Sequence, residues 1–413
     1  MYNESFVSKI AQSKEEEKMA KIFVAFYNGM IDTGGGCPWK VPIFFESFLS
    51  GLKNAGNDLY IEQHGLFGAD FPIIPYEKRA KLEEFQPDLC ILFNNSYYDI
   101  TNVVECPILI FEADSPLYYS NKDVIRTSLD RYYFMVATTS GINVIKELFG
   151  ASENQIFYIP LYTEVHSDPV IEQETNISFI GTKFGVNPKV FPNHVFEVLN
   201  KNEEEKFILC VEEIKKNPFI QRENLKNKYN IESEHFDNVL KIPDLVSLLS
   251  CEKRIHVLSS IADLGLALFG TNSWRKDYYF DSRLNFLYNE KEVYTLEQNQ
   301  FIYNTSKIGI NISHLQAVNG FPWRVMDIMA SNACLVTDYH LDFDTVFEGI
   351  KLPVYIEDYD ARDLCKKLLK CENMRKEMVL SCQELIDSKY RFKHFLARLE
   401  DCLRMELHSD DMI

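Results

Sequence analysis

Short apolar runs alternate with amphipathic segments along the whole chain. The apolar runs have the length of buried strands, and many of the segments between them have the spacing of helices with one buried face. Because strands and helices alternate, we expect mostly parallel sheets covered by helices, as in an α/β protein. The predicted strands are residues 22–26, 58–63, 89–93, 108–111, 134–138 and 156–159 in the first half, and 176–180, 264–269, 283–288, 307–312, 333–337 and 353–356 in the second.

A change of composition near the middle of this series predicts a domain boundary. After residues 160–162 the chain enters a polar stretch, 164–175, as expected of a linker, and a new strand follows. We therefore expect a first domain over residues 1–162 and a second over 163–389, with residues 390–413 as a closing helix. Within the second domain, residues 187–262 are predicted to form a run of helices that is longer than a minimal crossover.

Residues 301–339 carry the most informative pattern. The strand 307–312 is followed by a loop, a helix over 323–331 and the strand 333–337. Ligands of such units bind outside the carboxyl ends of the strands, where helix N-termini present N–H groups. Gly320 in the loop allows close backbone approach, and Arg324 stands at the start of the helix. The unit predicts a site for an anionic ligand.

Composition and charge narrow the classes of partner. The chain has 413 residues, 46% of them apolar, and 43 basic against 61 acidic residues give a net charge of −18. This balance argues against a protein that tracks nucleic-acid phosphates and against a broadly basic membrane-binding surface. The ten cysteines are scattered without metal-ligand spacing, and neither a signal peptide nor a transmembrane segment is visible. We expect reduced thiols, a cytoplasmic location and at most peripheral membrane association.

Several motifs resemble a known family. Residues 319–339, with the runs NGF, RVMD, ASNA and CLVTDY, look like the carboxyl-terminal signature of CgeB-like glycosyltransferases. The same stretch resembles the E-x7-E segment of retaining GT-B glycosyltransferases, because seven residues separate Asn319 from Asp327. Asn319 departs from that pattern, since an amide cannot carry charge. Three further runs fit the family in the same order: GTK at 181–183, GTNSW at 270–274 and LNFLYN at 284–289.

The resemblance implies a fold and a set of binding residues. The implied fold is GT-B, with two Rossmann-like domains facing each other across a cleft, and the closing helix returning to the first domain. In this fold the second domain holds a nucleotide sugar, with Asp327 accepting hydrogen bonds from ribose hydroxyls and Arg324 and helix N–H groups binding phosphate. The alternative for Asp327 is to complement the helix dipole or pair with Arg324. The implied donor-binding residues are Gly181, Lys183, Trp274, Leu287, Tyr288, Asn319, Gly320, Arg324 and Asp327.

Transfer of a sugar also needs an activated acceptor. Glu112 and Asp114 follow a predicted strand of the first domain and resemble the acidic strand-end position of the family, although capping of a helix by Asp114 is an equal alternative. His314 follows the strand 307–312 and is a further catalytic candidate, against the alternative of a structural histidine. The resemblance implies no metal, because GT-B enzymes generally stabilise the leaving phosphate with cations and a helix N-terminus.

Three functions are compatible with these features. The first is a metal-independent glycosyltransferase that moves a sugar from a nucleotide-activated donor to a glycan, lipid-linked or other surface-polymer acceptor, as in polysaccharide biosynthesis. The second is a sugar-nucleotide epimerase of GT-B architecture, which would need clustered acid and base groups. The third is a non-catalytic module that binds nucleotide sugars or glycans, and Asn319 in place of an acidic residue is its best support. Formation of a glycosidic product separates the first from the others.

Overall fold

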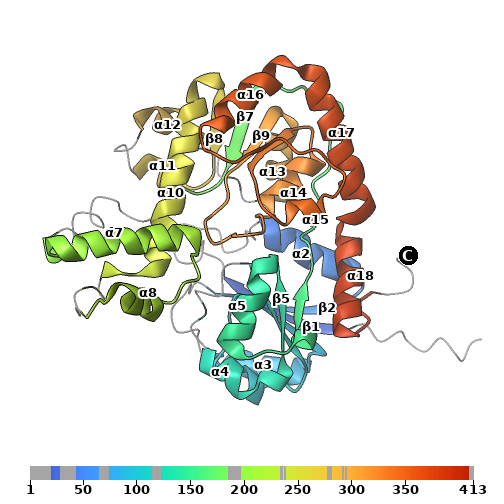
Figure 1. Cartoon of the computed structure of the whole chain (residues 1–413). Coiled ribbons are helices and arrows are strands. Elements are labelled where there is room, and N and C mark those ends of the chain that lie inside the picture. Colours follow the sequence, from blue (N-terminus) through green and yellow to red (C-terminus); the bar gives the residue numbers. More distant parts are fainter. Residues whose placement is uncertain are drawn as a thin grey trace, which may run out of the picture.

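Two parallel β-sheets, one in each half of the chain, organise the protein (Figure 1). The computed structural model describes residues 20–27, 43–64, 74–113, 119, 122–184, 197–232, 236, 239–276, 281–290, 293 and 295–408. The first sheet contains β1 (Lys21–Tyr27), β2 (Asp58–His64), β3 (Leu89–Phe93), β4 (Ile108–Phe111), β5 (Tyr132–Val136) and β6 (Ile156–Tyr158). The second contains β7 (Thr175–Ile180), β8 (Leu266–Phe269), β9 (Ser306–Asn311), β10 (Cys334–Asp338) and β11 (Val354–Tyr355).

Helices connect and cover the strands. In the first half the α-helices are α2 (Ile43–Asn54), α3 (Tyr76–Phe85), α4 (Lys122–Thr127) and α5 (Thr139–Phe149). Those of the second half up to β9 are α7 (Lys201–Lys216), α8 (Arg222–Tyr229), α10 (Ile242–Ile261), α11 (Ser273–Lys276), α12 (Ser282–Leu287) and α13 (Leu296–Asn304). After β9 come α14 (Arg324–Ala330), α15 (Phe343–Val346), α16 (Asp360–Lys370), α17 (Glu372–Lys389) and α18 (Phe392–Leu403). Short 3-10 turns are Ile100–Asn102, Leu129–Arg131, Glu153–Gln155 and Ala262–Leu264.

The first sheet has the strand order β2-β1-β3-β4-β5-β6, and every described pair is parallel. All residues of β3 and β4 are buried, because helices cover both faces of the sheet. Side chains that alternate along these strands therefore enter two different cores. Phe93 and Phe111 pack on the side of α2, whereas Cys90 and Ile108 pack in the core on the opposite face.

The second sheet has the order β11-β10-β9-β7-β8, also parallel. Its central strands β7 and β9 end next to each other, so the loops that follow them meet at one edge of the sheet. The predicted run of helices at 187–262 corresponds, in its described part, to α7, α8 and α10. Their side chains form a hydrophobic core that includes Phe207, Leu225 and Leu245, and in Figure 1 α7 and α8 extend away from the second sheet.

The end of the chain packs against the first domain. Helix α18 lies along α2, with the ring centroids of Phe395 and Phe48 6.3 Å apart and those of Phe395 and Phe111 6.1 Å apart. Gly51 on α2 leaves the space that the Phe392 ring occupies. The chain thus crosses between the domains twice, once after β6 and once between α17 and α18 (Figure 1).

One predicted strand is a helix. We expected a strand at residues 283–288, but Ser282–Leu287 forms α12. Asp281 caps this helix by accepting a hydrogen bond from the backbone N–H of Arg283 at 2.9 Å. Leu284 is buried and Phe286 is exposed, although side chains two residues apart would face the same side of a strand, so burial and the cap both fit the helix.

Candidate functional site

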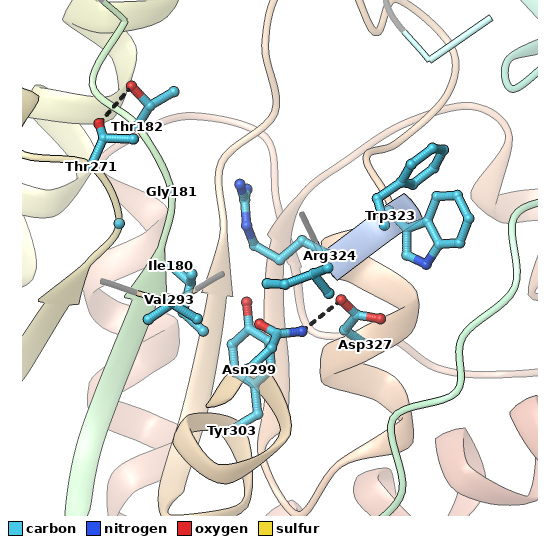
Figure 2. Close-up of a pocket in the computed structure, with 13 residues that line it drawn as sticks. Ile180, Gly181, Thr182, Thr271, Val293, Asn299, Tyr303, Trp323, Arg324 and Asp327 are labelled. Carbon is cyan, nitrogen blue, oxygen red and sulfur yellow. Dashed lines mark hydrogen bonds between the residues drawn. The ribbon is translucent and has the colours of Figure 1, made fainter. Parts of the chain in front are cut away.

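A pocket lies between the two domains, outside the carboxyl ends of β7, β8 and β9. Its cavity volume is about 320 Å³. Figure 2 shows its lining, to which α2 of the first domain contributes two residues and the second domain the rest. The lining residues are Ile43, Phe44, Ile180, Gly181, Thr182, Gly270, Thr271, Val293, Asn299, Tyr303, Trp323, Arg324 and Asp327. This set includes Gly181, Arg324 and Asp327 from the sequence prediction.

Two glycines bring the loops after β7 and β8 into direct contact. A Cβ on Gly270, whose φ is +127°, would lie 2.1 Å from the carbonyl oxygen of Gly181, so a side chain there is excluded. The indole N–H of Trp274 donates to the same carbonyl at 2.8 Å, and the hydroxyl of Tyr288 donates to the carbonyl of Gly270 at 3.1 Å. Backbone, not bulky side chains, therefore forms this wall of the pocket.

Hydroxyl groups follow these glycines at the mouth of the pocket. The hydroxyls of Thr182 and Thr271 lie 3.2 Å apart, and that of Thr271 lies 2.7 Å from the hydroxyl of Ser273 (Figure 2 shows the two threonines). Thr182 and Thr271 line the pocket. Hydroxyls can donate or accept, so this edge suits phosphate oxygens as well as sugar hydroxyls.

Arg324 supplies positive charge to the pocket. Its guanidinium donates to the side-chain oxygen of Asn311 at 3.0 Å and lies 5.1 Å from the centroid of the Phe179 ring. A Cβ on Gly181 would be 2.9 Å from its Nη2 atom, so the glycine leaves room for the guanidinium. In the described residues the guanidinium forms no ion pair, and the groups it acts on at close range are the neutral amide of Asn311 and the buried hydroxyl of Tyr303.

The N-terminus of α14 differs from the prediction. We expected its N–H groups to face an anion, but the N–H of Val325 donates to the carbonyl of Pro322 at 3.0 Å. Those of Met326 and Asp327 donate to the carbonyl of Trp323 at 2.9 and 3.3 Å. The turn before the helix satisfies these three donors, so the charged group that α14 brings to the pocket is the Arg324 side chain.

Asp327 is buried at the base of the pocket and is 6% exposed. Its two oxygens accept hydrogen bonds from the hydroxyl of Thr163 at 2.6 Å and from the amide of Asn299 at 2.8 Å. Burial raises the pKa of Asp327 to about 6, although these two hydrogen bonds and the charge of Arg324 lower it in part. The carboxyl group lies in the first turn of α14, and its hydrogen bonds join the interdomain segment at Thr163 to α13.

Aromatic side chains from both domains close the pocket on the side of α2. The ring centroids of Trp323 and Phe44 are 3.8 Å apart, and those of Trp323 and Tyr162 are 4.7 Å apart. The carboxylate of Glu46 on α2 also accepts a hydrogen bond from the N–H of Leu296 at 2.9 Å. The first domain is therefore in contact with α13 and α14, and apolar surface adjoins the charged group of Arg324.

Asn319 and Gly320 lie at a second contact between the domains. The carboxylate of Asp342 accepts hydrogen bonds from the N–H of Thr139 at 3.0 Å and from its hydroxyl. The amide of Asn319 donates to the same hydroxyl at 3.3 Å. A Cβ on Gly320 would lie 2.3 Å from the Thr138 side chain. The loop before α14 thus packs on the start of α5, and Asn319 and Gly320 do not line the pocket.

Two of the predicted catalytic residues, Glu112 and His314, are not part of the pocket lining. Glu112 is buried after β4, with its carboxylate against Gly141 in the first turn of α5. Asp114 lies outside the described residues. His314 packs on Phe184 with ring centroids 4.6 Å apart, and burial together with the charge of Arg254 lowers its pKa to about 3. So weak a base is poorly suited to accept a proton at neutral pH.

Four other predicted binding residues are not part of the pocket lining. Lys183 follows Thr182 but is only 3% exposed. Trp274, 1% exposed, packs on Phe179 below the loop after β7. Leu287 and Tyr288 belong to the core of the second domain, where Tyr288 holds Gly270 through the hydrogen bond described above.

Sequence reasoning missed Thr163, Asn299, Tyr303 and Asn311. Thr163 and Asn299 are far from Asp327 along the chain, and no local pattern joins them. Tyr303 is fully buried beside Arg324 and Asp327, and burial raises its pKa further above the usual value. Asn311 had a usable signal, because a polar residue at the carboxyl end of a buried strand faces the ligand edge of a parallel sheet.

Metal ligands and membrane spans were searched for in the described part of the chain. There, no group of three or more His, Cys, Asp and Glu side chains has an arrangement that could hold a metal ion. No helix in those residues is long and apolar enough to cross a bilayer.

Comparison with known proteins identifies the architecture. Residues 253–401 match a family model described as glycosyl transferase-like, which covers less than half of the chain. Sucrose-phosphate synthase from Thermosynechococcus elongatus superposes with a TM-score of 0.55 at 9% identity, over 93% of this chain and 98% of that one. Anabaena HepE in complex with UDP-glucose gives a TM-score of 0.53 at 9% identity, over 93% and 99% of the two chains.

The chain has the GT-B fold. An alpha-glucosyltransferase in complex with UDP and a 13-mer DNA also shares it, with a TM-score of 0.50 at 10% identity over 94% of this chain and 100% of that one. No curated protein matches the sequence. In this GT-B protein the pocket lies where the two Rossmann-like domains face each other, and the residues matched by the family model include Arg324 and Asp327.

Proposed function

We propose that the protein is a glycosyltransferase that binds a nucleoside diphosphate sugar in the interdomain pocket and transfers the sugar to an acceptor held by the first domain. The main support for this proposal is the environment of Arg324. Its guanidinium lies in the pocket beside a neutral amide. A diphosphate would supply the counter-charge through charge-assisted hydrogen bonds.

The shape of the pocket supports this proposal. The backbone wall at Gly181 and Gly270 lets phosphate oxygens approach closely, and the hydroxyls of Thr182 and Thr271 offer further hydrogen bonds. Phe44 and Trp323 shield the other side from water, which strengthens electrostatic interactions inside. The family-model match over residues 253–401 and the nucleotide-sugar complex of HepE point to the same class of ligand.

The proposed chemical role of Arg324 is to stabilise the leaving diphosphate. As the bond from the sugar to the phosphate breaks, negative charge grows on the phosphate oxygen, and a fixed cation favours that state over the bound substrate. This supplies the charge stabilisation that a divalent metal provides elsewhere, so we expect transfer to continue in the presence of a chelator. The net charge of −18 favours an acceptor other than nucleic acid, such as a glycan or lipid-linked polymer.

Nucleotide binding and sugar transfer test this proposal separately. Calorimetric titration with UDP, GDP and CDP should give one clear binder, and Arg324→Ala should weaken it about ten- to a hundredfold. Arg222→Ala removes an exposed arginine on α8 and is the matched control. Labelled nucleotide sugar should then yield a glycosidic product. Failure of all three nucleotides and of the corresponding nucleotide sugars to bind would refute the proposal.

The position of Asn319 favours a second candidate, a non-catalytic nucleotide-sugar-binding module. The family pattern has an acidic residue at this position. Here the side chain is an amide, and it bonds to Thr139 at a contact between the domains. This candidate predicts the same nucleotide affinity and the same loss in Arg324→Ala. Unlike the glycosyltransferase proposal, it predicts that the protein neither transfers the sugar of the labelled donor nor slowly hydrolyses that donor.

A further inference from the structure

The partner of Arg324 is itself held by a buried polar network at the ends of β9 and β10. The amide nitrogen of Asn311 donates to the hydroxyls of Thr337 and Ser313 at 2.9 and 3.1 Å, and to the carboxylate of Asp338 at 3.2 Å. All four of these side chains are buried. The network thus runs from a carboxylate, through an amide, to the guanidinium in the pocket.

The network determines which way the Asn311 amide faces. The hydroxyls of Thr337 and Ser313 both donate to Asp338, at 3.2 and 3.0 Å, which leaves their lone pairs to accept from Asn311. Every neighbour of the amide nitrogen is therefore an acceptor. Rotating the amide would place its oxygen against the Asp338 carboxylate and its N–H groups against a cation. The amide oxygen of Asn311 is consequently directed at Arg324.

Asp338 is ionised and anchored from its other side. Lys253 on α10 forms an ion pair with it at 2.7 Å, and His340 lies at 3.3 Å. Burial alone would raise the pKa of this carboxyl, but hydrogen bonds and charge from His340 and Lys253 hold it below its usual value. Its negative charge also faces Arg254, a second buried guanidinium that acts electrostatically on Arg324.

We propose that Asn311 and Asp338 are positioning residues that hold the Arg324 guanidinium in the pocket, ready for the diphosphate of the donor. The inference rests on the proposed function. A carboxylate in direct contact with Arg324 would position it but also neutralise it. The neutral amide of Asn311 holds Arg324 in the orientation that Asp338 sets, and it does so without neutralising the positive charge of Arg324. A fixed cation loses little side-chain entropy when the ligand binds.

Coupling to Arg324 is the test of this role. We use UDP as the probe, or whichever of UDP, GDP and CDP binds the wild type, and measure its affinity by calorimetry. Asn311→Ala and Asp338→Asn should each weaken binding about tenfold. In an Arg324→Ala background the same changes should have almost no further effect, because the residues act through that side chain. An equal loss in both backgrounds, or no loss in the single variants, would overturn the proposal.

A second measurement does not need the nucleotide. Relaxation of the Arg324 side-chain Nε in the ligand-free protein, assigned by comparison with Arg324→Lys, should show a rigid guanidinium in the wild type and a mobile one in Asn311→Ala. A rigid guanidinium in that variant contradicts the positioning role even if nucleotide binding fails. Conversely, if the wild type binds nucleotide and Asn311→Ala and Asp338→Asn bind it with the same affinity, this inference is wrong while the proposed function stands.

Two further variants control for folding. Asp344→Asn changes an exposed carboxylate that bonds to Tyr339 at 2.7 Å, a few residues after Asp338, and should leave affinity and mobility unchanged. Ser313→Ala removes one hydroxyl of the network and keeps the ion pair between Asp338 and Lys253. If Asp338→Asn does not fold, Ser313→Ala takes its place, with an expected severalfold loss of affinity that again vanishes without Arg324.

Discussion

Asp327 shows how burial changes the role of a single carboxyl group. Its position on α14 was predicted correctly, but its two hydrogen bonds come from Thr163 and Asn299, both distant in sequence. With both oxygens engaged and 6% of the residue exposed, a ribose hydroxyl would have to share these acceptors. The raised pKa also makes the carboxyl a measurable contributor to stability.

We expect this contribution to depend on pH. The pKa of Asp327 is about 6 in the folded protein against an ordinary 3.8. Its stabilising contribution is therefore fully present below about pH 4 and is lost as the pH rises through 6, by on the order of 3 kcal/mol. Asp327→Asn does not titrate, and its amide can donate to Thr163 and accept from Asn299.

Urea unfolding of wild type and Asp327→Asn at pH 4.5 and 7.5 measures this effect. The variant should gain stability relative to the wild type as the pH increases. A difference between the two proteins that is the same at both pH values would show that the carboxyl titrates normally.

At the scale of elements, local patterns predicted most strands, helix α14 and the closing helix α18. The unit from β9 to β10 was clear because Gly320 and Pro322 interrupt the chain between two apolar runs. Residues 283–288 were misassigned because a segment of this length satisfies both periodicities. The contacts among Thr163, Asn299 and Asp327, and between Trp274 and Gly181, depend on how distant elements pack, so no local pattern contained them.

The loop after β7 depends on Trp274 of α11. Trp274→Phe keeps much of the buried surface but leaves the Gly181 carbonyl without its indole donor. We expect the free energy of unfolding to fall by about 1 to 3 kcal/mol. Because Gly181 lies beside the Arg324 guanidinium, nucleotide affinity should fall as well.

Denaturant unfolding and calorimetry of Trp274→Phe measure these two effects. Phe286→Leu, at an exposed position of neighbouring α12, is a suitable control. Unchanged stability and affinity would mean that the loop after β7 is held by its contact with Gly270 alone.

At the scale of the whole molecule, the contact between Thr139 and Asp342 joins the two domains outside the pocket lining. Asp342→Ala removes both hydrogen bonds across this contact. We expect the ligand-free variant to have a larger radius of gyration in X-ray scattering, because the domains then separate more readily. Nucleotide affinity should fall about three- to tenfold, since binding must also close the domains.

Asp344→Ala is the control for this experiment, because Asp344 bonds within its own domain to Tyr339. Identical scattering from wild type and Asp342→Ala would show that the aromatic contacts of Trp323 are sufficient to hold the domains together.

The return of α18 to the first domain has a consequence for synthesis on the ribosome. The face of the first sheet that carries Phe93 and Phe111 is completed by Phe395, which is translated after all of the second domain. During elongation that aromatic surface has its own helix α2 but lacks its last cover. Nascent chains that end before residue 392 therefore expose apolar surface that chaperones can bind, and the first domain reaches its final packing only after α18 has left the ribosome.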